Sequence, residues 1–293
     1  MGIDIHGLNF LRYAKTKKPF GSVMTIGRQG LHVIEPIIKE IFQTSSGYKN
    51  HEYCEELLSK YFEATNVESV DNSNYEGATY VHDMNQPIPT GLAGRFDTVF
   101  DGGCLEHIYN APQALKNCSL FCKPGGQILH VLPANNFCGH GFWQFSPELF
   151  FSLYSKSNGY ADTQVFIADL SNTKQWYQVK EPANGQRVNV MSPNSLYVLV
   201  RTVLKDADFN HAHVQQSDYV FEWDGLKNSD PKLQSTSGIK QQLKKIPFVY
   251  RYLSPIYHFC LKMKNNDGLS IKNPGLSLLK VQDLITKPTQ QPL

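Results

Sequence analysis

Short apolar runs alternate with helical patterns along the first two hundred residues of the chain. Apolar runs that end at Gly, Asp or Pro are typical of buried strands, and apolar positions three or four residues apart are typical of helices. The predicted strands span residues 22–26, 67–70, 78–82, 96–100, 127–132, 163–168 and 196–204. The predicted helices span residues 31–42, 51–62, 111–122 and 145–154.

This alternation predicts an α/β fold, with a doubly wound, mostly parallel sheet covered by helices on both faces. In such sheets, ligands bind at the carboxyl ends of the strands. The residues that follow the predicted strands are Gly27, Asp71, Asp83, Asp101, Gly102, Gly103 and Pro133. We therefore expect a domain over residues 1–205 with a ligand site at this edge, and an irregular, basic and aromatic C-terminal extension over residues 206–293.

Composition narrows the classes of protein that fit. Of the 293 residues, 41% are hydrophobic and 18% charged, which is enough apolar material for a buried core. The net charge of +2 gives no reason to expect a nucleic-acid partner. The six cysteines form no CxxC pair, so no metal site is predicted. No basic segment followed by an apolar run opens the chain, which predicts a cytoplasmic protein.

Residues 240–264 are basic and aromatic and contain no acidic residue. Such a stretch can lie on an anionic membrane surface. Pro247 and Pro255 interrupt any long helix, so packing against the rest of the chain or a partner is the alternative. Peripheral membrane contact is one expectation for this segment, and the oligomeric state is left open.

Three strand ends carry residues that suit a nucleotide cofactor. Gly27 follows the first predicted strand, where a small residue lets the backbone approach a ligand. Asp71 ends the second strand, where an acid grips a ribose diol in related folds. Asp83 can accept a hydrogen bond from an adenine amine, while the adjacent Met84 covers the ring.

In this order the motifs resemble class I S-adenosylmethionine-dependent methyltransferases of the methyltransferase type 11-like group. The run FDTVFDGGCLEH at residues 96–107 looks like the segment after the fourth strand of that family, and KPGGQIL at 123–129 looks like the turn and strand that follow. The resemblance covers about residues 21–170. It implies a Rossmann-like fold and S-adenosylmethionine as cofactor.

The resemblance also implies roles for individual residues. Gly27 would line the methionine part, Asp71 would bind the ribose, and Asp83 with Met84 would bind the adenine. Asp101 and Gly102 would lie beside the sulfonium, with Leu105 under the cofactor.

One loop departs from the family pattern. Residues 25–30 read TIGRQG, whereas the family has an acidic residue followed by GxGxG. Arg28 stands where the ligand is itself a cation, so we expect its side chain either to point away or to pair with the cofactor carboxylate. Asp71 lies 44 residues after Gly27, which indicates an additional helix near residues 51–62.

Methyl transfer to a hydroxyl needs alignment and a group that takes the proton. His140 and His107 are the candidate catalytic residues, with Glu106 as a third, because all follow the fourth or fifth strand of the pattern. The loop after residue 132 is polar and aromatic, which suits a sugar or another polar ring. Its candidate substrate-binding residues are Asn135, Asn136, Phe142, Trp143 and Gln144.

Residues 139–150, with residues 158–160 after them, also resemble uncharacterised bacterial methyltransferase-like proteins, some of them associated with surface-glycan or secondary-metabolite pathways. We therefore predict methyl transfer to a hydroxyl or amine of a small molecule or glycan. The alternative, motivated by the altered loop, is a catalytically silent methyltransferase-like partner module. A nicotinamide-dependent oxidoreductase is disfavoured because GxGxxG is absent.

Overall fold

The computed structural model describes residues 2–43, 53–212, 214–228 and 266–286. The strands are β1 (Gly2–Ile3), β2 (Gly21–Ile26), β3 (Gly30–Leu31), β4 (Ala64–Asp71), β5 (Tyr80–Val81), β6 (Phe96–Gly102), β7 (Cys122–Asn135), β8 (Tyr160–Asp169), β9 (Gln175–Val179), β10 (Leu196–Leu204) and β11 (Leu276–Lys280). The helices are α1 (Ile5–Lys17), α2 (Glu35–Phe42), α3 (Glu55–Tyr61), α4 (Ala111–Phe121), α5 (Pro147–Leu153), α6 (Ser217–Asn228) and α9 (Val281–Thr286), with 3-10 turns η1 (Thr90–Leu92), η2 (Leu105–His107) and η3 (Lys156–Asn158).

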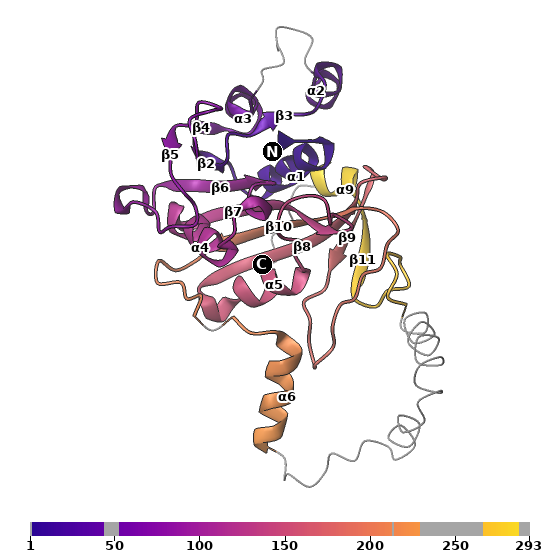
Figure 1. Cartoon of the computed structure of the whole chain (residues 1–293). Helices are drawn as coiled ribbons and strands as arrows, with labels where there is room; N and C mark the ends of the chain where they lie inside the picture. Colours follow the sequence, from indigo (N-terminus) through magenta and orange to yellow (C-terminus); the bar gives the residue numbers. More distant parts are fainter. Residues whose placement is uncertain (1, 44–52, 213, 229–265, 287–293) are drawn as a thin grey trace, which may run out of the picture.

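A nine-stranded sheet in the order β11-β9-β8-β10-β7-β6-β2-β4-β5 forms the centre of the molecule (Figure 1). The neighbours from β5 to β7 pair in parallel. The chain enters at β2, builds outward through β4 and β5, and then returns to add β6 on the other side of β2. This reversal of strand order between β2 and β6 is where doubly wound folds bind their ligands.

Beyond β7 the sheet becomes mixed. Strand β10 is antiparallel to both β7 and β8, and β9 is antiparallel to both β8 and β11. Only β9 and β10 therefore run against the direction of the other strands of this sheet. The predicted Rossmann-like sheet, mostly of one strand direction, is confirmed.

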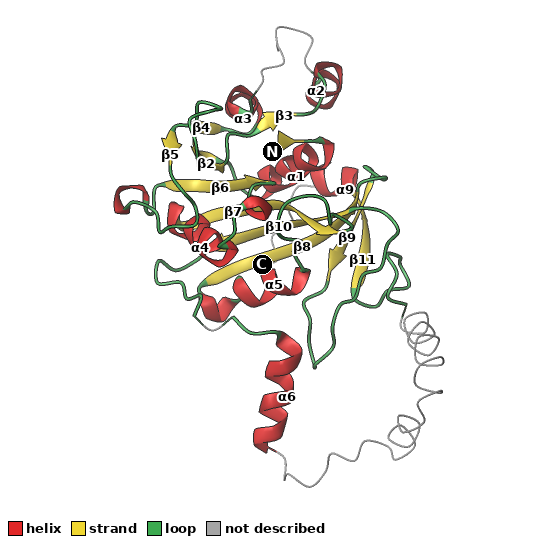
Figure 2. Cartoon of the chain, in the orientation of Figure 1, coloured by secondary structure: helices red, strands yellow, loops and turns green. Residues whose placement is uncertain are grey.

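Helices cover both faces of the sheet, as Figures 1 and 2 show. Along β7, Ile128 and Leu132 pack into one apolar cluster with α4 and α5, whereas Leu129 and Val131 pack into the other with α1, α2 and α3. Strand side chains alternate between the two faces, so one apolar strand contributes to both layers.

Several elements differ from the sequence prediction. The helix α1 has no predicted counterpart, because most of its residues from His6 to Ala14 are buried and its apolar stripe is weak. The helix predicted over 31–42 begins only at Glu35, since Gly30 and Leu31 pair with Gly2 and Ile3. The turn predicted at 123–126 lies inside β7 as an irregularity of its pairing with β6.

The C-terminal part is more ordered than an irregular extension would be. Residues 217–228 form α6, β11 pairs with β9, and Val281 of α9 is buried with the core side chains of α1. A strand from residues 276–280 thus belongs to the central sheet, while the division of the chain at residue 205 stays a prediction. The basic segment 240–264, to which we assigned membrane contact, lies outside the described residues. Within the described residues, no helix is both long and apolar enough to cross a membrane.

Candidate active site

The carboxyl ends of β2, β4, β5 and β6 lie side by side at one edge of the sheet, because these strands are parallel and adjacent. This arrangement brings Gly27, Asp71, Asp83 and Gly102 to the same edge. Gly27 starts the turn after β2 with a φ of 73°, and its N–H donates to the Val70 carbonyl at 2.7 Å. A positive φ of this size is readily adopted only by glycine.

The two acids at this edge keep oxygens for a ligand. Asp71 Oδ1 accepts only a long hydrogen bond from Ser73 N, at 3.4 Å. Asp83 Oδ1 accepts from the backbone N and the Nδ2 of Asn85 at 2.9 and 2.7 Å, and these bonds lower the pKa of Asp83. Among the residues that the structure describes, neither Oδ2 has a hydrogen-bond donor. Carboxylates with one open oxygen fit a ribose diol and an adenine amine, which are both donors.

Arg28 has its own partner in the protein. Its Nε donates to Glu55 Oε1 at 2.7 Å and its Nη1 to the Glu76 carbonyl at 2.8 Å, and the guanidinium lies 4.0 Å from the centre of the Tyr53 ring. The hydrogen bond that Arg28 donates to Glu55 raises the pKa of Arg28. The cation that the altered loop introduces is therefore paired with an acid from α3.

Gln29 is a residue that the sequence prediction missed. Its side chain is fully buried, and its Nε2 donates to the Ile26 carbonyl at 2.6 Å. Among the described residues, its Oε1 has no hydrogen-bond partner, and it lies against Gly102, where an added Cβ would be 2.6 Å away. A buried acceptor without a donor is costly. The ammonium of a methionine moiety is a donor of the kind that it lacks, so this part of the edge also fits the cofactor.

Asp101, which we predicted to lie beside the sulfonium, is fully buried, and both of its carboxylate oxygens have partners within the protein. Its Oδ1 accepts from the N–H groups of Cys104 and Leu105 at 2.9 and 3.4 Å, and its Oδ2 lies 3.0 Å from His130 Nδ1. The other ring nitrogen of His130 lies 2.8 Å from the Tyr154 hydroxyl. This buried chain of hydrogen bonds holds the turn after β6. Sequence reasoning missed His130 and Tyr154, although a histidine within an apolar strand was a usable signal.

Two further predicted cofactor residues are part of the core. Leu105 is fully buried, and Met84 is only 4% exposed. Both belong to the apolar cluster on the side of α4 and α5. The carbonyl of Met84 accepts a hydrogen bond from Asn117 Nδ2 at 3.1 Å, which ties the Asp83 turn to α4. Whether either contacts the cofactor stays a prediction.

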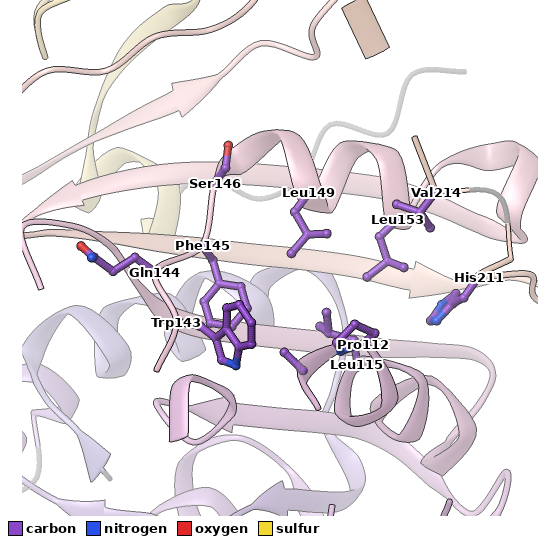
Figure 3. A pocket seen from close by; sticks show the side chains of 11 residues that line it. Pro112, Leu115, Trp143, Gln144, Phe145, Ser146, Leu149, Leu153, His211 and Val214 are labelled. Atoms are coloured by element: carbon purple, nitrogen blue, oxygen red, sulfur yellow. The ribbon is translucent and has the colours of Figure 1, made fainter. Parts of the chain in front are cut away.

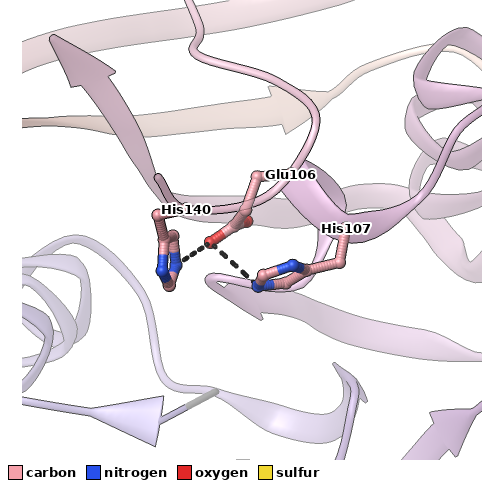
Figure 4. Close-up of side chains that lie close together, drawn as sticks. All are labelled: Glu106, His107 and His140. Carbon is pink, nitrogen blue, oxygen red and sulfur yellow. Dashed lines mark ion pairs between the residues drawn. The ribbon is translucent and has the colours of Figure 1, made fainter. Parts of the chain in front are cut away.

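The three candidate catalytic side chains come together (Figure 4). Glu106 Oε1 lies 3.3 Å from His140 Nε2 and 3.9 Å from His107 Nε2. Glu106 is buried, whereas the two histidines are about half exposed. Burial and the charge of Asp101 raise the pKa of Glu106 to about 8, and burial next to His140 lowers the pKa of His107. We call Glu106, His107 and His140 the polar cluster.

The loop after β7 is held against η2 by its backbone. The Glu106 carbonyl accepts from Phe142 N at 2.6 Å and from Trp143 N at 3.3 Å. Gly141 has a φ of 74°, and an added Cβ would stand 2.7 Å from that carbonyl. Since only glycine fits this contact, Gly141 fixes His140 next to Glu106.

The predicted substrate-binding residues fall into two groups. Asn135 is the last residue of β7. Asn136 Nδ2 donates to the carbonyls of Ser192 and Asn194, and Gln144 Oε1 accepts from Phe137 N, so these two exposed side chains hold the loop after β7. Phe142 is 68% exposed and packs edge-on against Tyr109, which is 75% exposed. The two rings of this aromatic pair belong to residues two positions after His107 and His140. The sequence pattern gave no reason to predict a role for Tyr109.

A cavity of about 320 Å³ lies next to this loop, between α4 and α5 (Figure 3). Its wall is mostly apolar and is lined by Ala111, Pro112, Leu115, Trp143, Gln144, Phe145, Ser146, Leu149, Leu153, His211 and Val214. Trp143 lines the cavity, and its ring N–H donates at 2.9 Å to the carbonyl of Ile108, the residue after His107. The volume is in the range of small-molecule sites.

The fold and the residues at this edge are typical of α/β proteins that bind a nucleotide at the switch in strand order, here between β2 and β6. A family model described as a methyltransferase domain matches residues 45–213. That segment is more than half of the chain, and the chain belongs to this family. The predicted enzyme class, S-adenosylmethionine-dependent methyltransferase, and its cofactor are thereby confirmed. The match begins after the altered loop at 27–30, which it does not cover.

Solved structures that resemble the chain are also methyltransferases. A S-adenosylmethionine-dependent methyltransferase of Thermotoga maritima is 17% identical, with 69% of this chain and 92% of that chain covered and a TM-score of 0.34. The N-methyltransferase NodS of Bradyrhizobium japonicum is 13% identical, with 69% and 94% covered and a TM-score of 0.41. The 1,6-didemethyltoxoflavin-N1-methyltransferase of Burkholderia thailandensis is 13% identical, with 70% and 80% covered and a TM-score of 0.37. No match was found among curated proteins.

Proposed function

We propose that this methyltransferase acts on a hydroxyl or amine of a small molecule or glycan that enters between the polar cluster and the cavity beside Trp143. The observation that carries the proposal is the position of the polar cluster. Glu106 stands three residues after Gly103, and the loop that carries His140 continues into Trp143 and Gln144, which line a cavity large enough for an acceptor. Acceptor and cofactor residues therefore share one edge of the sheet.

The described residues divide the work of binding the cofactor. Asp71 binds the ribose hydroxyls, Asp83 the adenine amine, and Gln29 with Gly102 the methionine end. S-adenosylmethionine supplies a methyl group on a sulfonium, whose C–S bond breaks as the bond to the acceptor forms, leaving S-adenosylhomocysteine. Holding the two reactants in line is the main contribution of the protein.

The acceptor proton has to leave as the new bond forms. The polar cluster offers the groups for this step, because His107 and His140 are partly exposed and Glu106 holds them from the buried side. The exposed pair Phe142 and Tyr109 offers ring faces to an acceptor at the same place. The apolar wall of the cavity suits an aliphatic or aromatic part of the acceptor.

Calorimetric titration with S-adenosylhomocysteine tests the cofactor site. We expect one site per chain and at least a tenfold loss of affinity in Asp71→Ala, because the ribose loses its acceptor. Asp208→Ala, which lies outside the edge, is the matched control and leaves the affinity unchanged. Absence of binding at high ligand concentration would contradict the proposal and favour a catalytically silent module.

Transfer of a tritiated methyl group tests the acceptor site. The probes are phenols and primary amines that carry aliphatic tails of increasing length. We expect turnover to rise with tail length until the cavity is filled, and Leu149→Trp, which narrows the cavity, to remove that gain. Equal turnover for all tails, with no effect of Leu149→Trp, would place the acceptor elsewhere.

A further inference from the structure

We propose that the polar cluster binds a divalent transition-metal cation, held by Glu106, His107 and His140, and that this cation activates a hydroxyl acceptor. The inference rests on the proposed function for the role of the cation, but the site itself stands on the geometry of the three side chains. Two imidazoles and one carboxylate suit Zn²⁺ and similar cations of intermediate softness.

The distances are close to those of a coordination site. The three candidate ligand atoms all lie within 4.8 Å of one another. Two atoms bound at about 2.1 Å in tetrahedral geometry lie about 3.4 Å apart. Glu106 Oε1 and His140 Nε2 are already 3.3 Å apart, and the 3.9 Å to His107 Nε2 needs a shift of about half an ångström. The half-exposed histidine rings have room for that rotation.

A second observation points to a missing cation. The other oxygen of Glu106, Oε2, is buried and has no hydrogen-bond partner among the residues that the structure describes. The side chain as a whole is only 2% exposed. A buried carboxylate oxygen without a donor is costly, and a cation coordinated by the same carboxylate offsets that cost.

The backbone around the polar cluster keeps the ligands in place. The Glu106 carbonyl holds the Phe142 and Trp143 N–H groups, and Gly141 permits this contact. His140 and Glu106 therefore come from two segments that are fixed to each other, whereas His107 is the neighbour of Glu106 in η2. A preorganised set of ligands of this kind costs little to assemble.

Three protein ligands leave coordination positions open, as in catalytic metal sites. The polar cluster follows β6, whose carboxyl end lies at the edge that carries the cofactor residues. A hydroxyl oxygen that binds at an open coordination position has its pKa lowered and loses its proton to solvent water, after which its lone pair forms the bond to the methyl carbon as the C–S bond breaks. A protonated amine has no lone pair and is repelled by the cation, so the inference selects a hydroxyl acceptor over an amine.

Metal binding is measured on the full-length protein after chelation and dialysis. Titration with Zn²⁺ is followed by calorimetry, and Co²⁺ is added separately to record its visible absorption. We expect one site per chain and a loss of affinity of at least tenfold in Glu106→Gln, His107→Ala and His140→Ala. Glu181→Gln changes an exposed acidic residue that follows β9 and serves as the matched control for Glu106→Gln, with unchanged affinity.

Circular dichroism and thermal unfolding of each variant separate loss of the site from loss of the fold. Glu106→Gln keeps the size of the buried side chain and is the variant most certain to fold. Zn²⁺ affinity that is the same in all three ligand variants as in the wild-type protein would overturn the inference.

Failure of the inference is distinguishable from failure of the proposed function. If the metal-free enzyme transfers methyl groups at the full rate, the proposed role of the cation is wrong and His140 is again the candidate general base. Site-specific Zn²⁺ binding in a protein that does not bind S-adenosylhomocysteine would leave the metal site standing and contradict the proposed function.

Discussion

The buried hydrogen-bond chain from Asp101 through His130 to Tyr154 gives the sharpest stability prediction. His130→Phe keeps an aromatic ring in the place where the imidazole stacks on Tyr154, with ring centres 5.8 Å apart and planes 8° from parallel. Packing is therefore largely preserved. The substitution removes both hydrogen bonds of the imidazole, at 3.0 Å to Asp101 and 2.8 Å to Tyr154.

The cost follows from what is left unpaired. Asp101, His130 and Tyr154 are at most 1% exposed, so water cannot replace the lost partner. Asp101 Oδ2 becomes a buried carboxylate oxygen without a donor, and breaking a buried pair in this way costs about 3–5 kcal/mol. Tyr154→Phe removes one hydroxyl and leaves one ring nitrogen unpaired, which costs about 1–3 kcal/mol.

Urea unfolding followed by circular dichroism measures both free energies of unfolding. In the double variant the orphaned Tyr154 hydroxyl is also gone, so we expect it to be more stable than the sum of the single effects by about 1 kcal/mol or more. Tyr109→Phe removes an exposed hydroxyl and is the control, with a change below about 0.5 kcal/mol. A loss under 1 kcal/mol in His130→Phe, or strict additivity in the double variant, would refute the reasoning.

Three other predictions concern single residues around the site. Gly141→Ala places a Cβ 2.7 Å from the Glu106 carbonyl, at a φ of 74°. We expect the free energy of unfolding in urea to fall by about 1–3 kcal/mol and the affinity for Zn²⁺ to weaken. An unchanged affinity for Zn²⁺ would show that this contact does not position His140. Arg28→Gln breaks a partly exposed ion pair, so we expect the free energy of unfolding to fall by about 1 kcal/mol or less. The affinity for S-adenosylhomocysteine should change by less than about threefold. A larger change of this affinity in calorimetry would assign Arg28 to the cofactor site. Burial lowers the pKa of His211 from 6.5 to about 4, so the unfolded state takes up this proton at a higher pH than the folded state does. The free energy of unfolding therefore falls as the pH drops from 6.5 to 4, by about 1 kcal/mol because the ring is partly exposed. Unfolding curves of His211→Asn with the same pH dependence as the wild-type protein would contradict this assignment.

Much of the parallel half of the fold could be predicted from the sequence. The strands β2, β4, β6 and β7 contain short apolar runs, and those of β2, β4 and β6 lead to Gly27, Asp71 and Asp101; both features are local in sequence. The helices α4 and α5 were predicted within a few residues, because Pro112 and Pro147 stand in their first turns and caps precede them. The family resemblance rested on the same stretch and held.

The rest of the fold depends on contacts that are distant in sequence. Strand β11 joins β9 across about a hundred residues, and a five-residue strand with alternating exposure gives little signal alone. Helix α1 is buried on most sides, so its periodicity is weak. Short edge strands and fully buried helices derive their stability from packing, which a local pattern does not record.

For the candidate site, the order of residues along the chain is enough to place Asp71 and Asp83 after strands, and His107 and His140 in the segments that follow β6 and β7. Which groups these side chains contact depends on how distant segments pack. The tertiary structure joins two histidines from separate loops on one buried carboxylate, pairs Arg28 with Glu55, and sets Gln29 against Gly102. Residue type and strand position are properties of the chain, whereas burial and the partner of a polar group arise only when distant segments pack together.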